Sequence, residues 1–158
     1  MKTWIIVAGA SGARLFKVDR GELRLVQQHA NPKGRARDHE LVSDRPGRVE
    51  KGKGHHVRSA LDPRTTPHDA ETLRFARKLG LVLDEARGRK AFEWLAIIAA
   101  PHFLGVLLPQ LSRRVSDAVI AIIDKDYVRV PGHQLHALLT DALMESAARR
   151  RLSEHQHA

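Results

Sequence analysis

The sequence predicts an α/β fold: a single domain built on a mixed β-sheet with helices on both faces. Three observations predict this class. Strand patterns come first, apolar strand patterns then alternate with helical ones, and no internal repeat is visible. The length of 158 residues suits one domain, whose core must be aliphatic because aromatic residues make up only 4%. We expect this domain to cover residues 1–151, followed by a flexible tail at 152–158.

The N-terminal residues predict a three-stranded antiparallel meander. TWIIVA (3–8), ARLFKV (13–18) and ELRLVQQ (22–28) are rich in β-branched residues or alternate polar and apolar side chains. Asp19-Arg20-Gly21 supplies a tight turn in which Gly21 can take positive φ. The run at 4–10 also lies at the short limit of a secretion-signal core, but it reads well as a first strand.

Residues 31–67 have a different character. This segment contains four prolines, four glycines, nine Lys or Arg residues and five Asp or Glu residues, and few residues that could anchor a core. Loops of this length without structure of their own are usually functional or disordered. We therefore expect a long basic loop between the meander and the next helix.

The second half of the chain predicts α-β-α-β-α. Residues 68–88 repeat apolar side chains at helical spacing, FEWLAIIAA (92–100) reads as a central strand, and Pro101 suits the start of a helix over 102–115. AVIAII (118–123) reads as another buried strand. A last helix is expected over 134–151, with Leu135, Leu138, Leu139 and Leu143 facing inward.

The charge balance favours an anionic partner. The net charge is +9 and the isoelectric point is about 10.6, which suits RNA, DNA, an anionic membrane face or an acidic protein. A basic surface that only keeps the protein in solution is the alternative. The absence of cysteine excludes disulfides and cysteine-ligated zinc and fits a cytoplasmic location, and no apolar stretch is long enough to span a bilayer.

Three motifs resemble small-ligand sites, and each has a simpler interpretation. Residues 47–53 match most of a phosphate-binding loop, but Gly54 replaces the Ser or Thr that holds magnesium, and no strand or helix flanks the motif. Residues 9–12 resemble a dinucleotide turn, but a strand follows them instead of a helix, which favours a hairpin turn. The third motif is a possible metal cluster of His55, His56, His68 and Asp69, but these residues lack a metal-binding spacing, so we expect no metal. Because the first two motifs fail, we also expect no nucleotide cofactor.

Asp124 and Asp126 flank Lys125 directly after a predicted buried strand. Ligands in α/β sheets bind beyond the carboxyl ends of strands, so this position suits a site. A turn that caps the next helix is the interpretation that the sequence favours. No arrangement of Ser, His and Asp can be singled out as catalytic.

The basic loop and the basic side of the first helix are the broadest functional signal. Their cations can contact a phosphate backbone, and the loop glycines let the main chain approach closely. Base-stacking aromatics are missing from the loop, which argues against sequence-specific reading of single strands. The candidate RNA-binding residues are Lys51, Lys53, Gly54, His55, His56, Arg58, Arg64, Arg74, Arg77 and Lys78. A solvated basic face is the alternative.

Four segments carry a family resemblance: WIIVAGASGARLFKV, DAETLRFARKLGLVLDEA, FEWLAIIAAPHFLGVLLPQLS and DKDYVRVPGHQLHALL. With them the chain resembles the bacterial host attachment family, described as proteins required for attachment to host cells. The resemblance extends over most of residues 2–143. Members of that family are in turn similar to the middle domain of archaeal and eukaryotic peptide-chain release factors, which implies an α/β domain with a meander and a loop before a long helix.

In those release factors the loop carries Gly-Gly-Gln and reaches the peptidyl-transferase centre. The comparable stretch here would be residues 52–56, in which Gly54 keeps a glycine while His55 and His56 stand in place of the second Gly and the Gln. The resemblance therefore implies the position of an RNA-facing loop without the side chain that helps to place the attacking water.

We therefore expect a cytoplasmic, non-enzymatic domain that binds structured RNA, on the ribosome or a tRNA. Two alternatives remain open. The first is a hydrolase that acts on peptidyl-tRNA-like esters through His55 or His56, because histidine can act as a base near neutral pH. The second is an interaction protein that contributes to attachment to host cells or surfaces, as the family description says.

Overall fold

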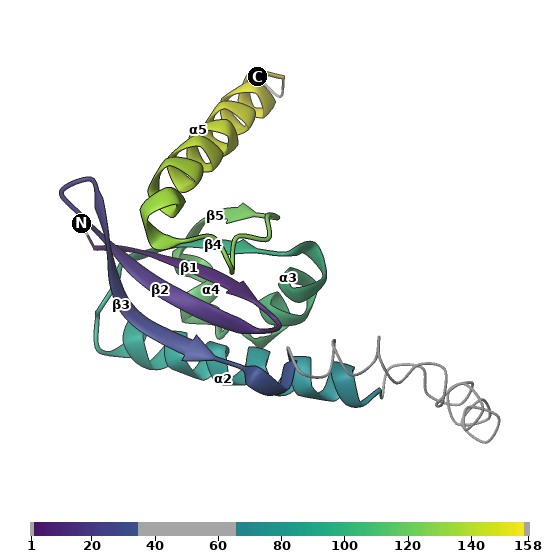
Figure 1. Ribbon diagram of the computed structural model, residues 1–158. Helices are drawn as coiled ribbons and strands as arrows, with labels where there is room; N and C mark the ends of the chain where they lie inside the picture. The colour runs from purple at the N-terminus through teal and green to yellow at the C-terminus, as the bar shows by residue number, and fades with distance from the viewer. Residues whose placement is uncertain (1, 35–65, 157–158) are drawn as a thin grey trace.

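Five strands form a mixed sheet in the order β3-β2-β1-β4-β5, with helices on both of its faces (Figure 1). The computed structural model describes residues 2–34 and 66–156. Its elements are β1 (Thr3–Gly9), β2 (Gly12–Asp19), β3 (Glu22–Ala30), α2 (Pro67–Gly88), β4 (Trp94–Ala99), α3 (Pro101–Leu107), the 3-10 turn η1 (Leu108–Gln110), α4 (Arg113–Ala118), β5 (Val119–Ile123) and α5 (Gly132–Gln156). The predicted fold class is confirmed.

The meander is also confirmed, since β1 pairs antiparallel with β2 and β2 antiparallel with β3. The tight turn between β2 and β3 places Gly21 at φ +78° and Arg20 at φ +54°. One feature of β3 was not predicted. Leu15 is opposite Gln27 and Phe16 is opposite Leu25, so Val26 is an extra residue that forms a β-bulge. The simple alternation predicted for this strand therefore ends at Val26.

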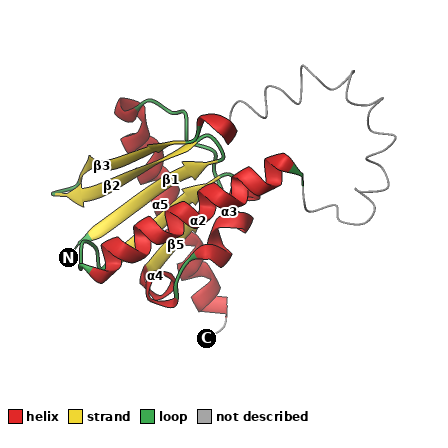
Figure 2. Ribbon diagram, turned by 90° about the horizontal axis from the view of Figure 1, so that it is seen from below, coloured by secondary structure: helices red, strands yellow, loops and turns green. Residues whose placement is uncertain are grey.

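Two hydrophobic clusters lie on opposite faces of the sheet, and alternate residues of β1 reach both. Trp4, Ile6 and Ala8 pack with α2, α3 and α4 on one face. Ile5 and Val7 pack with α5 on the other face. Figure 2 shows α2 crossing in front of the sheet, with α5 behind it. This layering is the physical reason why β1, and β4 next to it, consist almost entirely of apolar residues.

The predicted helix at 68–88 is confirmed as α2. Its N-cap is Thr66, whose hydroxyl oxygen accepts a hydrogen bond from the backbone N–H of Asp69 at 3.0 Å. The predicted apolar stripe is buried at Phe75, Leu79 and Leu83. β4 is confirmed as a central strand, with parallel neighbours β1 and β5 and every residue from 95 to 99 buried.

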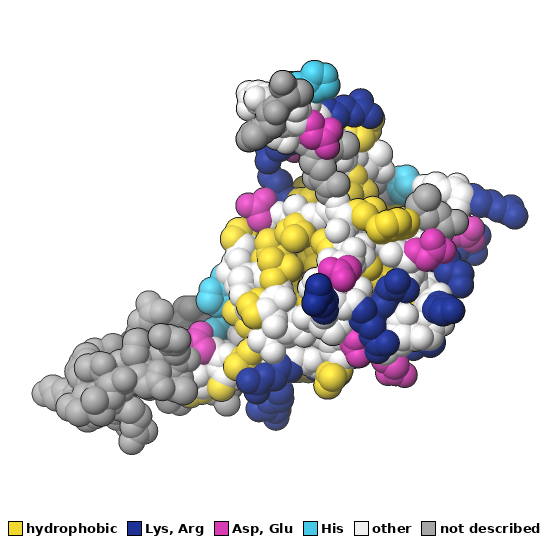
Figure 3. Space-filling view, turned by 180° about the vertical axis from the view of Figure 1, so that it is seen from behind, with side chains coloured by type: hydrophobic (Ala, Val, Ile, Leu, Met, Phe, Trp, Pro, Cys, Tyr) yellow, Lys and Arg dark blue, Asp and Glu magenta, His cyan; other side chains and the backbone are white. Residues whose placement is uncertain are grey.

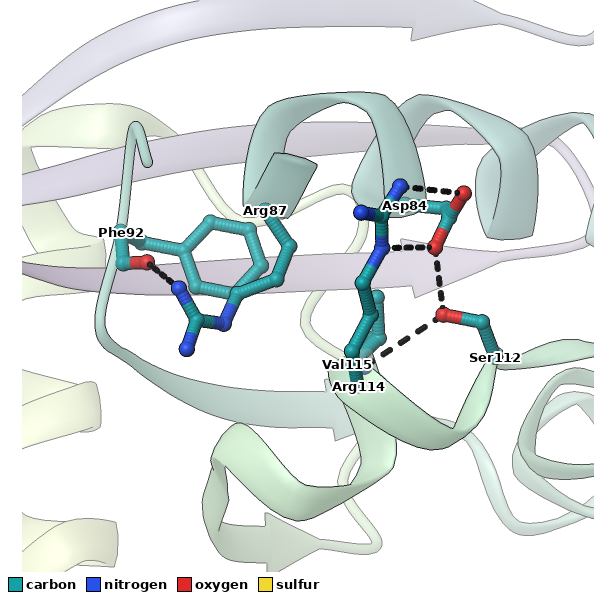
Figure 4. A network of polar contacts seen from close by, with 6 residues as sticks. All are labelled: Asp84, Arg87, Phe92, Ser112, Arg114 and Val115. Atoms are coloured by element: carbon teal, nitrogen blue, oxygen red, sulfur yellow. Dashed lines mark hydrogen bonds and ion pairs between the residues drawn. The ribbon is translucent and has the colours of Figure 1, made fainter. Parts of the chain in front are cut away.

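The single helix predicted over 102–115 is wrong. Pro101 does begin a helix, but α3 ends at Leu107, η1 follows, and Leu111 is extended. Pro109 lacks the amide N–H that would continue the helix. Ser112 then starts a new helix, α4, because its hydroxyl accepts a hydrogen bond from the N–H of Val115 at 3.4 Å. Figure 4 shows how Ser112 and Arg114 join this short helix to Asp84 of α2.

The prediction of a buried strand at 118–123 is wrong in part. β5 exists, but it is an edge strand that pairs only with β4 among the described strands. Ala121 and Ile123 are buried, whereas Ile120 is 37% and Ile122 45% exposed. The buried side chains pack against α5, whereas the exposed ones do not belong to either buried cluster.

Helix α5 packs by its first half and extends past the sheet with its second half (Figure 1). Leu135 and Leu139 are buried and Leu138 and Leu143 are half-buried, as predicted. The helix runs to Gln156, five residues beyond the predicted end. In the described part of the chain, no helix combines the length and the apolar character that crossing a membrane requires.

Candidate functional site

The carboxyl ends of four strands lie along one edge of the sheet. β1, β4 and β5 are parallel, and β3 points the same way because it is two antiparallel steps from β1. Ligands of α/β sheets bind beyond this edge. The segment at 35–65 leaves the described structure just after β3 and returns at the N-terminus of α2, so both of its attachment points lie here (Figure 2).

The first attachment point is held tightly against the turn between β1 and β2. The backbone N–H of Asn31 donates to the carbonyl of Ser11 at 2.9 Å, and its side-chain Nδ2 donates to the carbonyl of Ala10 at 2.8 Å. A Cβ added at Gly34 would lie 2.2 Å from that same Ala10 oxygen. Only glycine fits at this distance, so the chain begins the segment from a fixed position.

Arg14 of β2 fixes a second part of the edge. Its Nη2 donates to the carbonyls of Tyr127 at 2.9 Å and Val128 at 3.2 Å, in the connection between β5 and α5. Its guanidinium lies 5.8 Å from the ring centre of Phe16. Val128 lies close to Gly9: a Cβ added to Gly9 would be 3.3 Å from Cγ1 of Val128. Arg14 therefore holds this connection across the ends of the central strands.

Burial lowers the pKa of Arg14 below its ordinary value, with no carboxylate acting against that shift. The buried Nε of Arg14 has no hydrogen-bond partner within the described residues. A guanidinium carries five N–H donors, and the two carbonyls use only part of them. The side chain is thus a structural link that still has donors to offer.

Two adjoining hollows flank Arg14, and both are also lined by Gln28 of β3. The first, of about 280 Å³, lies between the β1–β2 turn and the connection that holds Arg129. The second, of about 570 Å³, lies between β3 and the first turn of α5. We call the two together the Arg14 trough.

Lys78 of α2 places a positive charge near the opposite face of β3, beside His29. His29 accepts or donates one hydrogen bond with Gln27 at 3.0 Å. Burial and, second, the positive charge of Lys78 on α2 lower the pKa of His29, so His29 is the less charged partner of this neighbouring pair at neutral pH. Basic side chains therefore lie on both sides of the strand from which the 35–65 segment departs.

A family model described as "Protein required for attachment to host cells" matches residues 4–139. The chain belongs to this host attachment family. No curated protein matches the sequence. Among solved structures, the Aquifex aeolicus Ppx/GppA phosphatase (type II variant) is similar at 15% identity and a TM-score of 0.35. The match covers 78% of this chain and 35% of the phosphatase chain, so this chain spans about a third of the phosphatase's length.

The host attachment match includes every residue of the sheet edge described above and ends at Leu139, the last fully packed leucine of α5. Of the predicted RNA-binding residues, Arg74, Arg77 and Lys78 lie on the exposed side of α2, as expected. Arg74 forms an ion pair with Glu71 at 2.9 Å. Lys and Arg side chains are visible along the lower part of the face in Figure 3, where α2 lies. The others, Lys51, Lys53, Gly54, His55, His56, Arg58 and Arg64, lie outside the described residues.

Three other sequence motifs of this host attachment protein can be compared with the described structure. Residues 9–12 form a hairpin turn, as predicted. No group of three or more metal-ligating side chains occurs within residues 2–34 and 66–156. Asp124 and Asp126 are exposed and do not cap a helix, because α5 begins only at Gly132; that interpretation is wrong.

Sequence reasoning missed Arg14, Arg129 and the trough of this host attachment protein. The available signal was Arg14 itself, a charged residue two positions before the buried Phe16 and therefore on the same face of the strand. A charge on that face needs partners, and the carbonyls that it binds are more than a hundred residues away in sequence.

Proposed function

We propose that this host attachment protein is a cytoplasmic, non-enzymatic RNA-binding domain whose partner is structured RNA of the ribosome or a tRNA. One observation supports the proposal most. The 35–65 segment, with eight Lys or Arg residues and five Asp or Glu residues, begins and ends at the sheet edge where Lys78, Arg14 and Arg129 also lie. Phosphate groups are the ligands that such a set of cations favours.

The exposed side of α2 extends this surface. Arg77 and Lys78 are exposed, and no carboxylate of the described residues forms an ion pair with either. Arginine and lysine side chains on a helix can follow a phosphate backbone without reading bases. The resemblance to the release-factor middle domain supports the same partner, because the loop of that domain works on the ribosome.

The described residues give no catalytic set at this edge. The hydrolase alternative rests on His55 and His56, which the structure does not describe, so we propose binding as the activity. Attachment to host cells is then a cellular consequence, and the RNA contact is the molecular event that we expect to underlie it.

Co-sedimentation of the full chain with purified ribosomes, and filter binding to tRNA, test this proposal across a salt series. We expect saturable binding that weakens by a factor of about 10³ or more between roughly 50 and 200 mM salt if six or more phosphates are contacted. Absence of binding to ribosomes, rRNA and tRNA at the low-salt end would overturn the proposal. Replacement of both His55 and His56 by Ala, with peptidyl-tRNA turnover as the readout, separates binding from hydrolysis.

A further inference from the structure

The Arg14 trough differs chemically along its length. At the end near the β1–β2 turn, the smaller hollow is lined by Arg14 and Arg129, and no Asp or Glu of the described residues lines it. Arg129 is exposed, so its charge is free to meet a ligand from solvent. Two guanidinium groups without a carboxylate form the kind of surface that a phosphate group favours.

The N-terminus of α5 adds to this positive end. Pro131, directly before the helix, lines the smaller hollow, and Gly132, the first helical residue, lines the larger one. The first turn of the helix holds no acidic residue. The positive end of a 25-residue helix dipole is therefore not neutralised by its own sequence. His136, one turn later, lines the same hollow and supplies a further hydrogen-bonding group.

The floor of the larger hollow is apolar. Phe16 of β2 and Leu23 and Leu25 of β3 line it. The β-bulge at Val26 keeps Leu25 directly opposite Phe16, and Leu25 is 53% exposed although it adjoins a hydrophobic cluster. A ligand that covers this leucine removes apolar surface from water. Glu22 at the rim offers an acceptor to an N–H or O–H group.

We propose that the Arg14 trough binds a nucleotide unit, with its phosphate at Arg14 and Arg129 and its base against Phe16, Leu23 and Leu25. This inference rests on the proposed RNA-binding function and specifies one site within it. The larger hollow of about 570 Å³ lies within the range of small-ligand sites. The unit can come from a free mononucleotide or from an unpaired nucleotide of an RNA.

The first arm of the test uses the full chain and free ligands. Titration with adenosine 5′-monophosphate, followed by calorimetry or by NMR shifts, is compared with adenosine alone and with inorganic phosphate alone. We expect the nucleotide to bind at least about tenfold more tightly than either part, since both ends of the trough are then occupied. Equal affinities, or no saturable binding of the nucleotide, would overturn the proposal.

The second arm uses variants at both ends of the trough. Arg129→Glu removes the solvent-facing cation, and Leu25→Gln weakens the apolar floor. Each is expected to weaken nucleotide binding by roughly ten- to a hundredfold, because charge-assisted hydrogen bonds or buried apolar contacts are lost. Arg113→Glu is the matched control, since Arg113 is exposed on α4 on the other face of the sheet. Equal effects of Arg129→Glu and Arg113→Glu would contradict the assignment.

The third arm separates this inference from the proposed function by measuring the affinity of the same variants for tRNA and ribosomes. If RNA binds and Arg129→Glu leaves its affinity unchanged, the trough is not the site, and the RNA-binding proposal stands. If the nucleotide binds and no RNA does, the RNA-binding proposal fails, and the trough is a site for a free nucleotide. Thermal melting of each variant confirms that it is folded.

Discussion

Arg114 of α4 binds both carboxylate oxygens of Asp84 in α2, with Nε 2.7 Å from Oδ1 and Nη2 2.9 Å from Oδ2 (Figure 4). The hydroxyl of Ser112 donates a third hydrogen bond to Oδ1 at 2.6 Å. The bonds from Arg114 first, and from Ser112 second, lower the pKa of Asp84 from 3.8 to about 2. This pair connects the short helix before β5 to the longest helix on that face of the sheet.

The lowered pKa predicts acid sensitivity. Above pH 3.8 both the folded and unfolded states carry ionised Asp84, so its stabilising contribution is fully present. As the pH falls from there towards about 2, the unfolded state takes up a proton first and the contribution is lost. Urea unfolding of the natural protein and of Asp84→Asn should therefore differ less at pH 2 than at pH 5. Asp117→Asn, at an exposed carboxylate of α4, is the control, and a constant difference for Asp84→Asn would contradict the prediction.

Gly80 allows α2 and η1 to approach closely. A Cβ at this position would lie 2.6 Å from the backbone oxygen of Gln110, which cannot move as a flexible side chain can. Gly80→Ala should lower the free energy of unfolding by about 1–3 kcal/mol through overpacking. Gly105→Ala is the matched control, since nothing lies within 4 Å of its added Cβ in a helix, and we expect it to stabilise by about 0.5–1 kcal/mol. Denaturant unfolding measures both, and equal effects would rule out the steric reason.

Asn31 should be necessary for the start of the 35–65 segment. Asn31 is 7% exposed, and its side chain donates to the carbonyl of Ala10 at 2.8 Å. Asn31→Ala removes that donor and should cost about 1–3 kcal/mol of unfolding free energy. Pro32→Ala, at the exposed next residue, is a nearby comparison. An unfolding midpoint of Asn31→Ala that equals that of the natural protein would show that the contact does not hold this attachment point.

The basic side of α2 should affect the salt dependence of RNA binding. Each phosphate contact contributes about 0.7–0.9 to the slope of log affinity against log salt. Removal of two contacts by Arg77→Gln with Lys78→Gln should therefore reduce the slope by roughly 1.4–1.8. Arg113→Gln with Lys17→Gln removes the same charge from exposed positions away from that edge and serves as control. A slope that changes equally in both double variants would indicate a general charge effect.

Local patterns were sufficient for most of the fold. The strand patterns of the meander, the apolar stripe of α2 and the apolar run of β4 each predicted their element. Local patterns suffice here because side chains on one face recur every two residues in a strand and every three or four residues in a helix. The helix predicted over 102–115 failed at Pro109, where a missing amide N–H outweighs the apolar periodicity. The exposed residues of β5 could not be predicted from the sequence pattern either, because an apolar run such as VIAII is compatible with an edge strand and with a central strand.

The sequence by itself determined the α/β class, the positive net charge, the three strands of the meander and the exposed cations of α2. Only the tertiary structure decided that Arg14 meets Tyr127 and Val128, that Lys78 lies near His29, and that both attachment points of the 35–65 segment share one edge. The physical reason is distance along the chain. Secondary structure follows from side chains a few residues apart, whereas these contacts join residues far apart in sequence and depend on the order and direction of the strands.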